Sequence, residues 1–136
     1  MNIPEINTEY TVSEKVDKTN IALTVGSGTL EVLATPSVIA LMEQAASQLV
    51  QPYLDEGITT VGTMIAAEHL SASPIGADIT AKAILTGIDG RKYSFDLFAY
   101  DNAGLIAKGR HERFSVKSES FLKKANDKIA NHKNKE

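Results

Sequence analysis

The chain has no cysteine and no tryptophan, and only 6% of its 136 residues are aromatic. Without cysteine it has no disulfide framework, no thiolate nucleophile and no cysteine-based metal site. Positive charge is not in excess either. The formal net charge is -3 and the sequence pI is about 5.6, which argues against a nucleic-acid partner held by phosphate contacts.

Long hydrophobic runs are also missing, and the longest apolar stretches are far too short to cross a membrane. The first ten residues, MNIPEINTEY, lack the basic and apolar regions of a signal peptide, so a cytoplasmic protein is expected. The length fits one domain over residues 1–136, in which residues 118–136 form a C-terminal helix and a polar tail.

The clearest secondary-structure signal is a helix over residues 36–50. It would begin with Thr35 as N-cap and Pro36 at the first helical position. An apolar, alanine-rich face of this kind is expected to pack on a sheet. The residues at helical spacing on that face are Val38, Leu41, Met42, Ala45, Ala46, Leu49 and Val50.

Two strand-like runs, residues 10–16 and 20–25, precede the expected helix. Four more follow it with no helix between them: residues 59–71, 78–87, 92–100 and 105–116. The last four are joined by short connections, which predicts an antiparallel meander. A short amphipathic helix is expected at residues 120–128. The fold class is therefore α+β, one long helix against a curved sheet of about five strands. The free sheet edges favour a homodimer.

Three side chains could combine for acyl-transfer chemistry. Thr35 and Glu43 lie two turns apart on the expected helix, about 12 Å along its axis, and a crossing strand could place His69 between them. His69 would share its strand face with Thr63, Ile65, Ala67 and Ser71. Each residue also has a plainer interpretation, because Glu43 could reach water at the edge of the apolar stripe and His69 could be structural or solvated.

The segments ATPSVIALMEQAA, VGTMIAAEHLSASPIGADITAKAIL, DGRKYSFDLFAYD and GLIAKGRHERF occur in the order and with the gaps of one family. From about Val12 to Lys128 the chain resembles the hot-dog-fold thioesterases, and within them the fluoroacetyl-CoA thioesterase-like family. The resemblance implies a hot-dog fold in which a sheet encloses the central helix, two subunits pair their sheets, and acyl-CoA enters near the dimer interface.

The resemblance also implies roles for individual residues. Thr35 and His69 would be hydrogen-bonded and steer the thioester or a water, and Glu43 would act as general base or as nucleophile. The backbone N–H of Gly62 would hold the thioester carbonyl, unless this glycine only relieves crowding or marks a bulge. Arg113 would contact coenzyme A or stabilise the structure, unless it is an ordinary surface residue of a strand.

Members of the family that act on the fluorinated substrate have aromatic side chains before the helix, whereas residues 26–32 here read GSGTLEV. A short-chain acyl-CoA is therefore the expected substrate. No cofactor is expected, since coenzyme A is part of the substrate. His111 and His132 form no metal-ligand spacing and are expected at the surface.

The alternative to a thioesterase is a non-catalytic acyl-CoA binding module on the same fold. A hydratase or dehydratase would need a different His/Asp arrangement.

Overall fold

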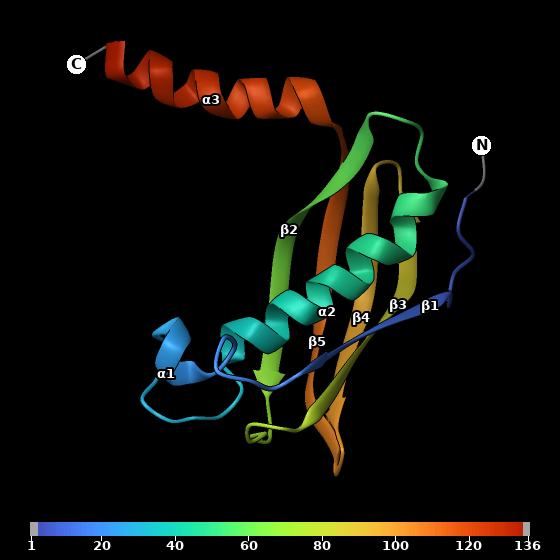
Figure 1. Ribbon diagram of the computed structural model, residues 1–136. Coiled ribbons are helices and arrows are strands. Elements are labelled where there is room, and N and C mark those ends of the chain that lie inside the picture. The colour runs from blue at the N-terminus through green and yellow to red at the C-terminus, as the bar shows by residue number, and fades with distance from the viewer. Residues whose placement is uncertain (1–2, 135–136) are drawn as a thin grey trace.

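The computed structural model describes residues 3–134. One long helix lies across a five-stranded antiparallel sheet, which confirms the α+β hot-dog architecture (Figure 1). Both hairpin connections expected after residue 87 are present, between β3 and β4 and between β4 and β5. The elements are β1 (Glu9–Lys15), α1 (Ala22–Val25), α2 (Thr35–Val50), η1 (Gln51–Tyr53), β2 (Ile58–His69), β3 (Asp78–Asp89), β4 (Lys92–Asp101), β5 (Gly104–Lys117) and α3 (Ser118–Asn134).

The strand order is β1-β3-β4-β5-β2, so the predicted four-stranded meander is wrong at its first step. β2 pairs with β5 and not with its chain neighbour β3. The link between β2 and β3 crosses the ends of β5 and β4, where Leu70 N donates to Ile106 O at 2.7 Å and Ser73 Oγ donates to Asp101 Oδ2 at 2.8 Å. The crossing makes β1 and β2 the two edges of the sheet.

The core lies between α2 and the concave face of the sheet. All seven α2 residues expected to be buried are buried, and Ala45 and Ala46 are fully enclosed. Their small side chains let the helix approach the strands closely. The strand residues facing them alternate as expected and are also buried: Ile79, Ala81, Ala83, Leu85, Phe95, Leu97 and Ala99.

The segment before α2 differs from expectation, because residues 20–25 are not an extended strand. Ala22–Val25 forms the one-turn helix α1, which ends at Gly26 in the left-handed conformation with φ of 89°. Ile21 makes an isolated antiparallel bridge with Leu33. The chain thus doubles back on itself before α2, which brings this segment beside the first turn of that helix.

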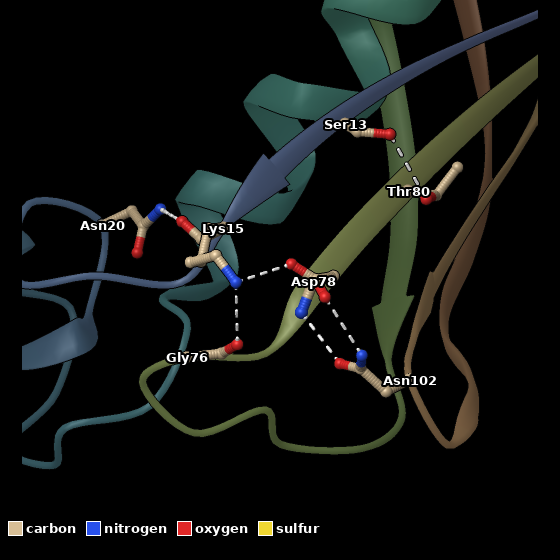
Figure 2. A network of polar contacts seen from close by, with 7 residues as sticks. All are labelled: Ser13, Lys15, Asn20, Gly76, Asp78, Thr80 and Asn102. Carbon is tan, nitrogen blue, oxygen red and sulfur yellow. Dashed lines mark hydrogen bonds and ion pairs between the residues drawn. The ribbon is translucent and has the colours of Figure 1, made fainter.

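β1 is fastened to the sheet by a polar network that joins three segments of the chain (Figure 2). Lys15 Nζ lies 2.8 Å from Asp78 Oδ1 and donates to Gly76 O at 3.4 Å. The Asn102 amide bonds both the backbone and the carboxylate of Asp78. The network holds β1 to the start of β3 at the end of the sheet nearest the start of α2.

The C-terminal helix α3 is longer than the predicted 120–128, because Ser118 and Glu119 begin it two residues earlier and residues 129–134 continue it. It projects away from the sheet (Figure 1). Phe121, Leu122 and Ile129 are exposed on it. His132 lies on this helix at the surface, as expected. The end of the predicted polar tail, residues 135–136, lies outside the described residues. None of the helices within residues 3–134 has the length and apolar character needed to cross a membrane.

Candidate active site

The first turn of α2 presents the hydroxyl of Thr35 to the end of β2. Thr35 is the first helical residue and not the N-cap. The N-cap is Ala34, whose carbonyl accepts from Ser37 N and Val38 N. Because the Thr35 hydroxyl does not cap the helix, it is available to another partner. Thr35 Oγ1 lies 2.8 Å from His69 Nδ1, so the predicted hydrogen bond between these residues is present.

His69 is the last residue of β2, and its imidazole is half-buried beside α2. It pairs with Ala107 of β5, which is itself buried against the helix. Burial lowers the pKa of His69, and the nearby Ser71 backbone opposes this shift in part, so the imidazole is neutral at pH 7. Among the described residues Nε2 of His69 has no hydrogen-bond partner although it is buried. A buried polar atom left unpaired is a natural contact for a ligand.

A pocket of about 240 Å³ opens beside this pair. Its walls come from the segment before α2, from Thr35 and His69, and from the link after β2. Apart from the imidazole of His69, the side chains are small or aliphatic, and none is phenylalanine, tyrosine or tryptophan: Ala22, Ser27, Val32, Leu33, Thr35, His69, Leu70, Ser71 and Ala72.

Glu43 lies two turns further along α2, at a second pocket of about 270 Å³. Its carboxylate is half-buried, so it is neither in the core nor fully in water. A Cβ added to Gly62 would lie 3.0 Å from Glu43 Oε2 and 3.2 Å from His111 Cε1. The missing side chain at Gly62 therefore makes the space that the Glu43 carboxylate uses.

A register shift between Gly62 and Met64 reorganises this part of β2. Strict alternation predicts Thr63 on the face of His69, but the shift leaves Thr63 unpaired in the register between β2 and β5 and turns Gly62 toward Glu43 instead. Thr63 Oγ1 donates to the Glu112 carbonyl at 3.2 Å. Gly62 thus both marks a bulge and relieves crowding, the two plainer roles expected for it.

Arg113 is buried and faces α2, which overturns its interpretation as an ordinary surface residue. Its Nε donates to Thr60 Oγ1 at 2.8 Å and its Nη2 to Thr60 O at 2.9 Å. Burial lowers the pKa of Arg113, and the charge of Glu43 raises it. The guanidinium retains its charge, since an arginine in a protein stays protonated. A buried positive charge therefore lies close behind the carboxylate of Glu43.

His111 is 1% exposed, so its prediction as a surface residue is wrong. Period-two alternation along β5 carries the missed signal, since Ala107, Gly109, His111 and Arg113 share one face of that strand. The lack of a metal-ligand spacing around His111, on which the surface prediction rested, carries no information about burial.

The structure brings the predicted residues together in two groups. Thr35 and His69 form one, and Glu43 with Gly62 and Arg113 forms the other, about 12 Å away along the helix axis. His69 therefore lies at the Thr35 end and not between Thr35 and Glu43, because β2 runs antiparallel to α2. Within residues 3–134 no cluster of three acidic, histidine or cysteine side chains could hold a metal ion.

Comparison with known proteins gives a consistent result. The family model for fluoroacetyl-CoA-specific thioesterase matches residues 16–119. The fluoroacetyl-CoA thioesterase of Streptantibioticus cattleyicolor is 37% identical over 98 residues, covering 72% of this chain and 70% of that protein.

Solved structures extend the likeness to nearly the whole chain. A point mutant of the fluoroacetyl-CoA-specific thioesterase superposes with a TM-score of 0.89 at 28% identity, covering 94% of this chain and 99% of that one. A thioesterase superfamily member from Thermus thermophilus has the same fold, with a TM-score of 0.89 at 22% identity over 100% of both chains.

Proposed function

Because the chain belongs to the fluoroacetyl-CoA-specific thioesterase family, we propose that it hydrolyses a short-chain acyl-CoA thioester with Thr35, Glu43 and His69 as its catalytic residues. The reaction adds water across the thioester and gives a free acid and the thiol of coenzyme A. The observation that carries the proposal is the Thr35–His69 hydrogen bond of 2.8 Å, which leaves a buried imidazole nitrogen unpaired.

His69 supplies a hydrogen-bond donor in this scheme. When the Thr35 hydroxyl donates to Nδ1, the neutral imidazole carries its proton on Nε2, which is the nitrogen without a partner. That N–H can donate a hydrogen bond to the thioester carbonyl oxygen or to the sulfur of the departing coenzyme A, and the departing thiolate takes up the proton that the attacking water releases. The lowered pKa favours the neutral ring, which is the form that makes this hydrogen bond with Thr35.

Glu43 supplies the carboxylate, and two routes use it. In the first, it takes a proton from a water that attacks the thioester carbonyl. In the second, it attacks that carbonyl itself and forms a mixed anhydride, which water then cleaves. A single turnover in ¹⁸O-water identifies the second route if the label enters the protein. The first route puts the label into the product acid, whereas cleavage of the anhydride at the Glu43 carbonyl puts it into the protein.

Gly62 and Arg113 support the reacting groups. Gly62 leaves room for a thioester beside Glu43, and its backbone N–H stabilises the negative oxygen that forms in the transition state. The guanidinium of Arg113 is buried behind the carboxylate, and its positive charge attracts the Glu43 side chain. Arg113 therefore acts on the Glu43 side chain, and because it is buried we do not expect it to bind the phosphates of coenzyme A.

We further propose a homodimer that joins the two groups of residues. β2 is an edge strand of 12 residues, whereas β1, the other edge, has 7 residues and carries exposed charges at Glu9, Glu14 and Lys15. The longer and less charged edge is the better surface for pairing with a second copy. Antiparallel pairing of two β2 strands about a point between Ile65 and Ala66 would place Gly62 of one subunit opposite His69 of the partner subunit. One thioester would then meet both groups.

The substrate follows from the pocket beside His69. Its small aliphatic walls suit a short acyl chain, and the absence of phenylalanine, tyrosine and tryptophan among them leaves nothing to distinguish fluorine from hydrogen. We therefore expect similar kcat/KM values for acetyl-CoA and fluoroacetyl-CoA. A preference above about 100-fold, worth about 2.7 kcal/mol, would contradict this part of the proposal.

The test of the function is a thiol-release assay with saturated acyl-CoAs of increasing chain length, run on the parent protein, Glu43→Gln and the control Gln44→Glu. Gln44 is the exposed neighbour of Glu43 on α2. Turnover that disappears in Glu43→Gln and persists in Gln44→Glu supports a thioesterase. Tight acyl-CoA binding without thiol release from any substrate would instead identify a binding module.

A further inference from the structure

His111 is the most buried ionisable side chain near the candidate site, yet it is not one of the three proposed catalytic residues. It lies on β5 beneath α2 and contacts the ring of Phe95, with 5.9 Å between ring centroids. Its Cε1 and the Glu43 carboxylate both line the space left open at Gly62. The imidazole therefore forms part of the wall against which a thioester would lie.

Both nitrogens of His111 are engaged, and their partners determine the tautomer. Nδ1 lies 2.7 Å from the Met64 carbonyl, which can only accept, so Nδ1 carries the proton. Nε2 lies 3.2 Å from Arg113 Nη1, which can only donate, so Nε2 is the acceptor. The ring is thus held neutral in one tautomer.

The charged groups around the ring act in opposite directions. Burial lowers the pKa of His111 most, the positive charge of Arg113 lowers it further, and the Met64 hydrogen bond raises it. Glu43 from α2 and Glu112 from the same strand also raise it. The balance is a lowered pKa, in agreement with the neutral ring that the two hydrogen bonds require.

The two hydrogen bonds tie together the parts of the site that surround Glu43. Met64 follows the register shift in β2, and Thr60 precedes it. The chain of bonds from Met64 through His111 and Arg113 to Thr60 therefore spans the bulge from both sides. Gly62 lies inside this span, and so its backbone cannot move independently of His111.

We infer that His111 is a positioning residue for the proposed hydrolysis: it fixes the Gly62–Met64 bulge and the Arg113 guanidinium around the Glu43 carboxylate. This inference rests on the proposed function. If His111 took up a proton, two donors would face each other at Nε2 and Arg113 Nη1, and the span would open. The neutral ring is thus a condition for activity, although His111 exchanges no proton with the substrate.

Two conservative variants separate the two bonds. In His111→Asn the amide can donate to Met64 O from near the position of Nδ1, and the acceptor for Arg113 is lost. In His111→Gln the amide oxygen can reach the position of Nε2 and accept from Arg113. We expect each to lower kcat about tenfold with KM nearly unchanged, and His111→Phe, which loses both bonds, to lower it about 100-fold. His132→Asn on α3 is the control.

The pH profile distinguishes positioning from a loss of fold. If protonation of His111 opens the span, kcat/KM falls at acid pH in the parent protein. That fall should move to lower pH in His111→Asn and His111→Gln, which have no titratable group at this position. Full activity with an unchanged profile in His111→Phe would overturn the inference.

A measurement without turnover keeps this inference separate from the proposed function. Long-range ¹H–¹⁵N spectra of histidine-labelled protein should show His111 as the Nδ1–H tautomer at pH 7. In Glu43→Gln, which we expect to be folded but inactive, the titration of His111 should move to lower pH, because the Glu43 carboxylate that raises the pKa of His111 is gone. An Nε2–H tautomer or a charged ring at pH 7 would overturn the inference even in an active enzyme. The expected spectra with no thiol release from any acyl-CoA would leave the arrangement intact and refute the proposed function.

Discussion

Replacing Gly62 with alanine tests the geometry of the Glu43 pocket with a single methyl group. The added Cβ would lie 3.0 Å from Glu43 Oε2, 3.2 Å from His111 Cε1 and 3.5 Å from Arg113 Nη1. Ordinary van der Waals contacts of a Cβ begin near 3.4 Å, so the first two neighbours are too close by a few tenths of an ångström.

The structure indicates which neighbour moves. His111 is enclosed and held by two hydrogen bonds, whereas the Glu43 carboxylate is half-buried at the end of a flexible side chain. The displacement therefore falls on Glu43. Since a misplacement of about 1 Å can lower the rate about 100-fold, a shift of a few tenths of an ångström predicts a loss in kcat of about tenfold. The free energy of unfolding should change by less than about 1 kcal/mol, because no backbone atom is crowded.

The assay is thiol release under saturating acyl-CoA, with urea unfolding of the same preparations. Gly87→Ala is the matched control, since its Cβ would meet Ser94 Cβ at 3.9 Å, and it should leave both quantities unchanged. Gly109→Ala is the opposite case. Its Cβ would lie 2.3 Å from the Ala66 carbonyl oxygen, and the protein should lose about 1–3 kcal/mol of stability or more. Parental kcat in a folded Gly62→Ala variant would refute the assignment of this pocket to the reaction.

Further predictions concern the other groups. His69→Ala should lower kcat about 100-fold or more with little change in melting temperature, and a parental rate would reduce His69 to a structural role. Thr35→Ser should retain most of the activity and Thr35→Val should lose it, as kcat measurements would show. Leu97→Ala should cost about 2–5 kcal/mol in urea unfolding, because Leu97 is fully enclosed. The pKa values of His69 and His111 in the folded protein lie below 6.5, so on acidification the unfolded chain binds protons first. The free energy of unfolding should therefore be at its full value above about pH 6.5 and should fall as the pH drops toward the folded-state pKa values. A free energy of unfolding that rises on acidification would contradict both shifts.

Regular patterns predicted most of the fold. The apolar spacing in α2 identified each of its seven buried residues, and alternation identified the buried faces of β3 and β4. The strand order was not predictable in the same way, because the link that carries the chain from β2 to β3 is held by contacts distant in sequence, such as Ser73 with Asp101. The α1 turn was missed because its four residues are too few to show a helical period.

The candidate site was predictable in its residue types but not in its arrangement. The Thr35–His69 pair was expected and is present. The register shift at Gly62 moves Thr63 off the strand face that strict alternation predicts for it. A period-two pattern does not indicate where such a shift occurs. The burial of His111 could have been predicted from alternation along β5, but its role could not, because that role depends on contacts with Met64 of β2 and with Arg113.

The most direct test of the account mixes two inactive variants, Glu43→Gln and His69→Ala, after unfolding and refolding them together. If one thioester meets Glu43 of one subunit and His69 of the partner subunit, each mixed dimer contains one intact site. Half of the dimers are then mixed, and the mixture should recover about a quarter of the parental thiol-release activity. No recovery, with mixed dimers demonstrated by mass spectrometry, would contradict the joining of the two groups across β2.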